Sequence, residues 1–103
     1  MSSIPDPALV EATAARLNQH AAAVRDRATH LRRASDGCQW DGHAALAFRH
    51  EAAAVVGVLH RSAAQLDDAS RALRRHAGDM RDELRKLEHE MRGVAELLGV
   101  RTR

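Results

Sequence analysis

The chain has 103 residues, a formal net charge of +2 and a hydrophobic content of 45%, but only one Phe, one Trp and no Tyr. Much of the hydrophobic content is Ala, so we expect one small domain with little material for a large core of its own. Ordering each residue costs about 1–2 kcal/mol. A small helical scaffold of this kind therefore usually needs oligomerisation for stability.

Three features bear on where the protein resides. A single Cys excludes an internal disulfide. No apolar run approaches the roughly 20 residues of a membrane span. The N-terminal residues Met1 to Pro5 contain neither a basic region nor an apolar segment. We therefore expect no stable membrane insertion and no cleaved signal peptide, so that export would need another route.

A first helix is predicted over about residues 7–36, because Asp6 is a good N-cap and Pro7 fits the first helical position. Two columns of side chains repeat every seven residues along it. The larger residues are Val10, Leu17, Val24 and Leu31, and the small ones are Ala14, Ala21, Ala28 and Ser35. In heptad notation the small residues occupy position a and the larger ones position d, so a partner helix can approach closely. Basic residues elsewhere on this helix are expected to face solvent: Arg16, Arg25, Arg27, Arg32 and Arg33.

An elbow is predicted over residues 37–42, and it contains the only Cys and the only Trp of the chain. Gly37 is expected to end the first helix in the left-handed conformation. Gly42 is expected to allow a tight entry into the second helix. Trp40 is expected to fill the open end between the two helices.

A second helix is predicted over about residues 43–98. Its seam consists of the repeat Leu59, Leu66, Leu73, Met80, Leu87 and Val94 and the column Val56, Ala63, Ser70, Ala77, Leu84, Met91 and Leu98. The heptad phase continues through Gly78, which favours one continuous helix. Gly57 is expected where another backbone comes close. At 1.5 Å per residue the helices would be about 45 Å and about 80 Å long, so the second must extend beyond the first.

The residues present no catalytic or metal-binding constellation. No two of the seven His lie three or four residues apart, the spacing that a metal site on a helix requires. Ser62 and Ser70 lie within the second helix without a paired base, and no phosphate-binding loop is present. The sequence therefore predicts that the protein is not an enzyme and takes no metal, cofactor or small-molecule substrate.

Basic residues of the second helix keep one alternative open, a dimeric nucleic-acid-binding protein. These residues are Arg71, Arg74, Arg75, Arg81, Arg85, Lys86 and Arg92. They lie among the heptads and are mixed with acids, whereas a basic-zipper protein has its basic block ahead of the heptads. This arrangement counts against nucleic acid as a partner. A second alternative is a cytoplasmic helical adaptor or chaperone for a larger secreted toxin.

The elbow and its surroundings resemble the WXG family, the early-secreted-antigen-like small proteins of the type VII (ESX) secretion system. The resemblance is carried by Trp40-Asp41-Gly42 in mid-chain, by Ala44, Ala45 and Phe48 after it, by the length near one hundred residues and by Ala-rich heptad helices on both sides. It covers nearly the whole chain. A bare W-x-G is weak evidence, but W-x-G in the elbow of a two-helix chain of this length is fairly specific.

The resemblance implies an all-α helix-turn-helix hairpin that pairs with a second hairpin into a four-helix bundle dimer. Such a dimer is exported folded, so the protein would be cytoplasmic before export and secreted through the type VII machinery. The export signal of the family is bipartite: the W-x-G elbow of one subunit, here Trp40 and Gly42, lies beside a Y-x-x-x-D/E motif of the other. The chain has no Tyr, which favours a heterodimer with a homologous WXG-like protein over a homodimer.

The predicted helices also carry more apolar surface than a single hairpin buries. A dimer would bury the excess, and a standard interface of roughly 1,600 Å² is within reach of two such hairpins. The residues predicted to form the hairpin and dimer interface are Val10, Leu17, Val24, Leu31, Phe48, Val55, Leu59, Leu66 and Leu73.

Overall fold

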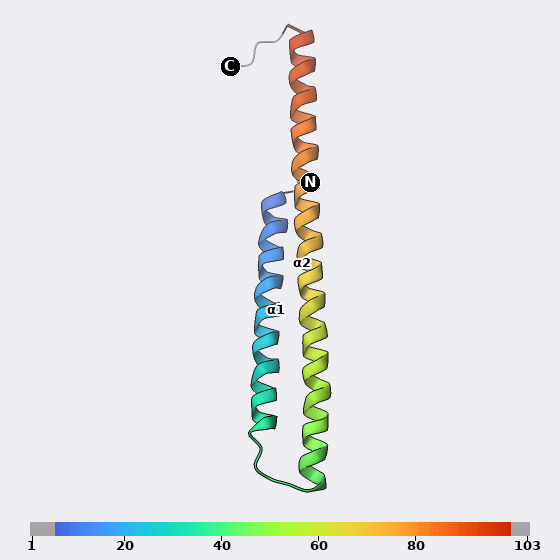
Figure 1. Cartoon of the computed structure of the whole chain (residues 1–103). Coiled ribbons are helices and arrows are strands. Elements are labelled where there is room, and N and C mark those ends of the chain that lie inside the picture. The colour runs from blue at the N-terminus through green and yellow to red at the C-terminus, as the bar shows by residue number, and fades with distance from the viewer. Residues whose placement is uncertain (1–5, 100–103) are drawn as a thin grey trace, which may run out of the picture.

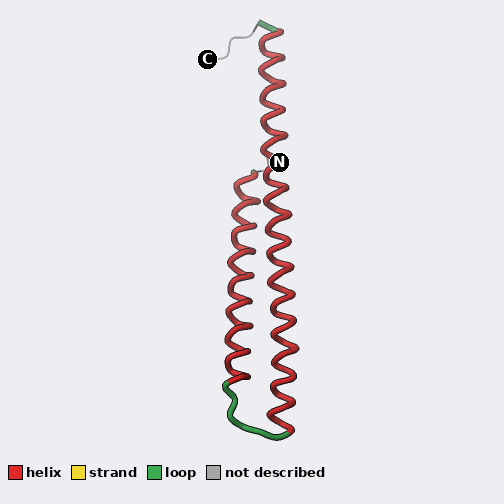
Figure 2. The backbone as a smooth tube through the Cα atoms, viewed as in Figure 1, coloured by secondary structure: helices red, strands yellow, loops and turns green. Residues whose placement is uncertain are grey.

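The computed structural model describes residues 6–99, which form two antiparallel helices joined by an elbow (Figure 1). Helix α1 comprises Pro7–Asp36 and helix α2 comprises His43–Leu97. The described part of the chain contains no strand, and loop structure separates the two helices only at the elbow (Figure 2). The prediction of an all-α helical hairpin is therefore confirmed. The ends of the predicted single domain, residues 1–5 and 100–103, lie outside the described residues.

The first helix begins as its sequence predicts and ends differently. The Asp6 carboxylate accepts a hydrogen bond of 2.9 Å from the backbone N–H of Ala8, which satisfies one of the free donors of the first turn. At the other end, the Gly37 N–H donates to the Arg33 carbonyl at 2.8 Å. Gly37 has φ −81° and ψ 0°, so the predicted left-handed cap is wrong. The right-handed conformation already places the N–H on a terminal carbonyl, and a positive φ is not needed.

The second helix starts at a glycine whose backbone conformation other residues avoid. Gly42 has φ 97° and ψ −173°, a region that is essentially restricted to glycine. This conformation turns the chain directly into α2, as predicted for the entry into the second helix. From there α2 runs without a break through Gly78, which confirms the prediction of one continuous helix.

Small side chains form the innermost layer of the hairpin. The buried column of α1 is Ala14, Ala21, Ala28 and Ser35, and that of α2 is Ala45, Ala52, Val56, Ala63, Ser70 and Ala77. Ala21 and Ala63 are 0% exposed. The larger residues three positions later, such as Leu17 and Leu66, are only half-buried. Close packing of the two backbones therefore rests on small residues, at position a along most of the seam and at position d for Ala45 and Ala52 near the elbow. Farther from the elbow, the Leu and Val side chains line one edge of the contact.

Gly57 does not provide the close backbone contact that the sequence predicts. A side chain at this position would meet only the Arg61 guanidinium, at 3.5 Å, and no backbone atom of α1. The prediction is wrong because Gly57 follows the buried position of Val56 and lies beside the seam. The close approach of the helices is made by Ala instead.

The two helices differ strongly in length. α1 has 30 residues and α2 has 55, and the molecule measures 85 × 24 × 18 Å. The interhelical ion pair nearest the free end of the hairpin joins Glu11 to Arg81. Beyond it, residues 82–97 of α2 continue past the start of α1, as the orange and red turns of Figure 1 show. We call this segment the overhang.

Candidate functional site

Polar side chains link the two helices along one edge of the Ala seam. Arg25 pairs with Asp67, Arg81 pairs with Glu11, and Arg32 Nη2 lies 3.3 Å from His60 Nε2. Every one of these residues stands four positions after a buried residue of its own helix, at heptad position e. An antiparallel pair of helices brings its e positions together on one side. We call this side the paired face; it comprises Glu11, Asn18, Arg25, Arg32, His60, Asp67 and Arg81.

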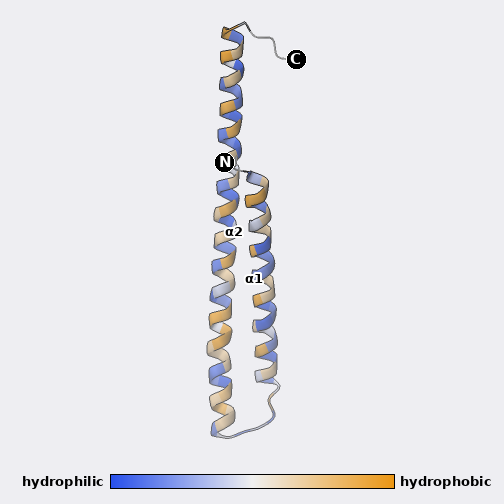
Figure 3. Cartoon of the chain, turned by 180° about the vertical axis from the view of Figure 1, so that it is seen from behind, coloured by the Kyte–Doolittle hydropathy of each residue, from blue (hydrophilic) through white to orange (hydrophobic). Residues whose placement is uncertain are grey.

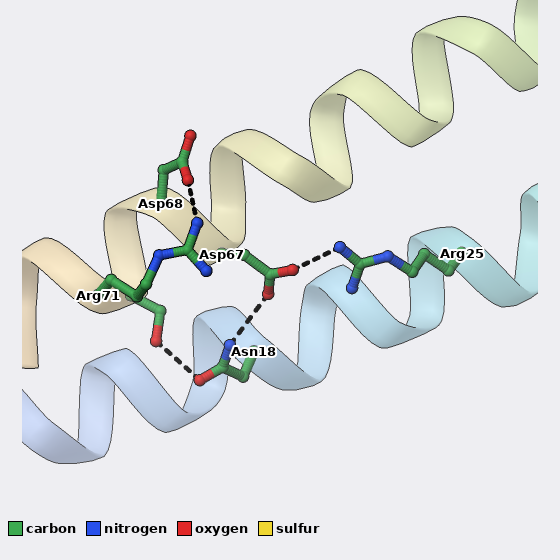
Figure 4. Close-up of polar contacts among 6 residues, drawn as sticks. Asn18, Arg25, Asp67, Asp68 and Arg71 are labelled. Atoms are coloured by element: carbon green, nitrogen blue, oxygen red, sulfur yellow. Dashed lines mark hydrogen bonds and ion pairs between the residues drawn. The ribbon is translucent and has the colours of Figure 1, made fainter.

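The centre of the paired face is a hydrogen-bonded group around Asn18 and Asp67 (Figure 4). Asn18 Nδ2 donates to Asp67 Oδ1 at 3.0 Å, and Arg25 donates to the other carboxylate oxygen. The fully buried Ser70 hydroxyl lies 2.7 Å from Asn18 Oδ1 and 2.9 Å from the Ala14 carbonyl oxygen, and it shares its proton between them. The group thus provides hydrogen-bond partners for the buried Ser70 hydroxyl. It also fixes the register of α1 on α2.

The ion pairs keep the acids of the paired face charged. The hydrogen bond from Arg25, supported by that from Asn18, lowers the pKa of Asp67 below its ordinary value. The hydrogen bond from Arg81 lowers the pKa of Glu11 in the same way, and Glu11 raises the pKa of Arg81. These bridges therefore persist from neutral pH into the mildly acidic range.

Arg25 and Arg32 remain exposed to solvent, as predicted, but the sequence did not reveal that each also links the two helices. Both lie at position e, directly beside the seam, and both contact a residue of α2. Heptad spacing assigns them to a flank of the seam, but the identity of their partners depends on the register between the helices. The sequence reasoning therefore missed the paired face.

The larger apolar residues lie on the side opposite the paired face. In an α-helix, a residue four positions after a buried one is rotated by about 40° to one side, and a residue three positions after by about 60° to the other. Because the helices are antiparallel, the position-d side chains of both point to the same side of the hairpin. We call this side the open face; it comprises Val10, Leu17, Val24, Leu31, Leu59, Leu66, Leu73 and Met80. All of these side chains remain partly accessible to solvent.

Two aromatic residues extend the open face to the elbow. Phe48 and Val55 stand three positions after the buried Ala45 and Ala52, on the side of the open face, and are 37% and 44% exposed. The Trp40 ring lies against Phe48 with ring centroids 5.8 Å apart. Figure 3 shows hydrophobic turns recurring along the whole length of both helices. All nine predicted interface residues therefore lie on this one side, with Trp40 at its elbow end.

The elbow is held by Arg49, which sequence reasoning did not single out. Arg49 Nη2 donates to the carbonyl oxygens of Cys38 at 2.9 Å and Trp40 at 3.0 Å. Trp40 itself is 51% exposed, so the prediction that it fills the space between the helices is wrong. Arg49 stands at position a, seven residues before Val56 and between the buried Ala45 and Ala52. A charged residue at a seam position is the signal that could have revealed its role.

The described residues offer little for metal chemistry or membrane insertion. No group of three or more His, Cys, Asp or Glu within residues 6–99 is arranged to hold a metal ion. Neither α1 nor α2 is long and apolar enough to cross a bilayer. The features that stand out are the open face, the exposed Trp40 and the overhang, all of them surfaces that suit protein contacts.

Comparisons with protein-family models, with curated proteins and with solved structures find no match to this chain. The geometry by itself defines a class: an elongated helical hairpin with one polar, internally bridged side and one apolar side.

Proposed function

We propose that this protein is a WXG-like component of a type VII secretion system that pairs with a homologous hairpin into a four-helix bundle. In this proposal it is not an enzyme, and it leaves the cell as a folded dimer, either as the substrate or as the partner of one. The observation that carries the proposal is the position of Trp40-Asp41-Gly42. This motif forms the elbow at one end of a continuous apolar face.

The open face supports pairing on energetic grounds. Its Leu and Val side chains are half-buried in the single hairpin, and removing apolar surface from water is worth about 25 cal/mol per Å². The paired face has already used its polar groups within the chain. A second hairpin therefore gains most by packing on the open face.

The charges beside the open face support a heterodimer. On the outer edge of α1, beside this face, stand the exposed residues Arg16 and Arg27, and no acid occupies an equivalent position between Leu9 and Ala34. Two copies that place these edges together would oppose like charges. A homologous partner with acids along its facing helix would avoid this repulsion. It would also supply the Tyr motif that this chain lacks.

The open face is equally compatible with a cytoplasmic adaptor or chaperone of a larger toxin, and export is what separates the two functions. Nucleic-acid binding has less support. Of the basic residues of α2, Arg71, Arg81, Arg85 and Arg92 each form an ion pair with an acid. Such pairs leave less positive charge for phosphates.

The test is secretion of the Trp40→Ala variant by the cell that carries the system, together with its partner. We expect at least tenfold less protein in the culture medium, while the helical dimer inside the cell stays intact. The matched control is Leu46→Ala, which removes a 64% exposed apolar side chain from the same end of α2. Unchanged export of Trp40→Ala would overturn the signal assignment. Wild-type protein that stays inside the cell would favour the adaptor.

A further inference from the structure

The overhang repeats the seam pattern of the hairpin outside the contact with α1. Leu84, Leu87, Met91 and Val94 continue the heptad of Ala77 and Met80 without a change of phase. They are 41%, 56%, 67% and 55% exposed. Two shallow apolar hollows lie along them; the second is lined by Leu87, Glu90, Met91, Val94, Ala95 and Leu98. A helix of about four turns with one exposed apolar stripe is the form of surface that binds another helix.

The charges that border this stripe are all acidic. Within the overhang the positions next to the stripe hold Glu83, Glu88 and Glu90, together with Ala95 and Leu97. Its basic residues Arg85, Lys86 and Arg92 lie farther from the stripe, where they pair with Asp82, Glu83 and Glu88 along the helix. Glu90 forms no ion pair within residues 6–99. A helix that docks on the stripe therefore meets carboxylates on both of its edges.

This pattern disfavours the overhang of a second copy as the occupant. In a fully overlapping antiparallel pair, equivalent flanking positions face each other, so Glu88 would oppose Glu88 and Glu90 would oppose Glu90 of the other copy. In a parallel pair, Glu83 would oppose Glu88. Like charges at these positions select against a pairing. A helix with Lys or Arg at the corresponding positions would instead form attractive pairs on both edges.

We propose that the overhang is a docking site for an amphipathic helix of another protein, with large aliphatic residues at heptad spacing and Lys or Arg along both edges. The stripe from Leu84 to Leu98 is about 20 Å long at 1.5 Å per residue, so the partner helix needs two to three heptads. The proposal is argued from the overhang alone and does not depend on export.

The experiment uses the full-length chain and two synthetic 21-residue helical peptides with identical Leu and Ile stripes, one with Lys and one with Glu at the flanking positions. Binding is measured by fluorescence anisotropy of the labelled peptide at two salt concentrations. We expect the Lys peptide to bind at least tenfold more tightly than the Glu peptide, and salt to narrow the difference. Equal binding of both peptides, or stronger binding of the Glu peptide, would overturn the proposal.

Two variants locate the site. Glu83→Lys/Glu88→Lys/Glu90→Lys should reverse the preference for the two peptides, and Leu87→Asp/Met91→Asp should abolish binding of both. The matched control is Asp26→Lys/Glu51→Lys/Asp68→Lys, which changes the net charge equally at exposed positions away from the overhang. It should keep the wild-type preference; loss of that preference in the control would show that net charge alone is responsible and would overturn the site. Circular dichroism verifies that every variant retains its helices.

Two further measurements test other occupants. Sedimentation equilibrium of the full-length chain would overturn the proposal if it showed self-association that Leu87→Asp/Met91→Asp removes, because the occupant would then be a second copy. Binding to anionic phospholipid vesicles that the same variant removes would indicate a membrane surface instead. We expect neither result, since the acidic edges repel both.

Discussion

The part of α2 that lies along α1 and the overhang share one heptad pattern and have opposite surroundings. Ala63 and Ala77 are fully buried, whereas Leu84 and Met91, at the same heptad position, are 41% and 67% exposed. Residue size changes with the surroundings: position a is Ala or Ser from Ala63 to Ala77, where α1 packs, and Leu or Met in the overhang. The contrast shows that a heptad repeat identifies a side of a helix that packs, and that the size of its residues indicates how closely the partner approaches.

The largest expected effect comes from breaking the small-residue seam. Ala63→Leu adds bulk where two backbones meet, so we expect the free energy of unfolding to fall by about 1–3 kcal/mol, or more if the helices separate. The control Ala95→Leu places the same side chain in the overhang and should change stability by less than about 0.5 kcal/mol. Thermal and urea unfolding followed by circular dichroism measure both. Equal effects in the two variants would contradict the difference between the two parts of α2.

The contact between α1 and α2 also depends on the elbow. Gly42→Ala places a side chain at φ 97°, and the resulting strain should cost about 1–3 kcal/mol. Gly78→Ala is the matched control, because a side chain there meets nothing within 4 Å and the residue lies within the continuous helix. It should stabilise the protein by about 0.5–1 kcal/mol. Urea unfolding of the two variants tests the prediction, which fails if both shifts have the same sign.

Truncating one Leu in each part of α2 sharpens the comparison. Leu66→Ala removes a half-buried side chain from the seam, and we expect a loss of about 1–2 kcal/mol, below the 2–5 kcal/mol typical of fully buried Leu. Leu87→Ala removes a side chain that is 56% exposed and should change stability by less than about 0.5 kcal/mol. Both are measured on the isolated chain. Comparable losses would mean that the overhang is covered in solution.

The smallest expected effect is the pH dependence of the paired face. Hydrogen bonds from Arg25 and Arg81 lower the pKa values of Asp67 and Glu11 in the folded state. The unfolded chain therefore binds protons first, and stability is fully present above the ordinary pKa range of carboxylic acids and falls as pH drops below it. We expect Asp67→Asn to reduce the slope of stability against pH in this acidic range. Urea unfolding of the wild-type protein and of this variant at several pH values measures the slope, and equal slopes in the two proteins would contradict the prediction.

Local sequence predicts much of this fold. Asp6 and Pro7 indicate where the first helix begins, Gly42 indicates the entry into the second, and the unbroken heptad phase through Gly78 predicts one long helix. These features depend on capping, backbone conformation and side-chain period, which neighbouring residues determine. The same period placed seven of the nine predicted interface residues, among them Leu17 and Leu66, at one heptad position, whereas Phe48 and Val55 belong to a neighbouring position.

Other features were decided only by the tertiary structure, because they depend on which residues of α1 and α2 lie opposite each other. Arg25 reaches Asp67 across 42 positions of sequence, and Asn18 reaches Ser70 across 52; no local pattern encodes these partners. Trp40 is 51% exposed, and Arg49 bonds to the carbonyl oxygens of the elbow; neither could be read from the sequence. The heptad determined which side of each helix packs, and the antiparallel register determined that polar bridges close one face and leave the apolar face open.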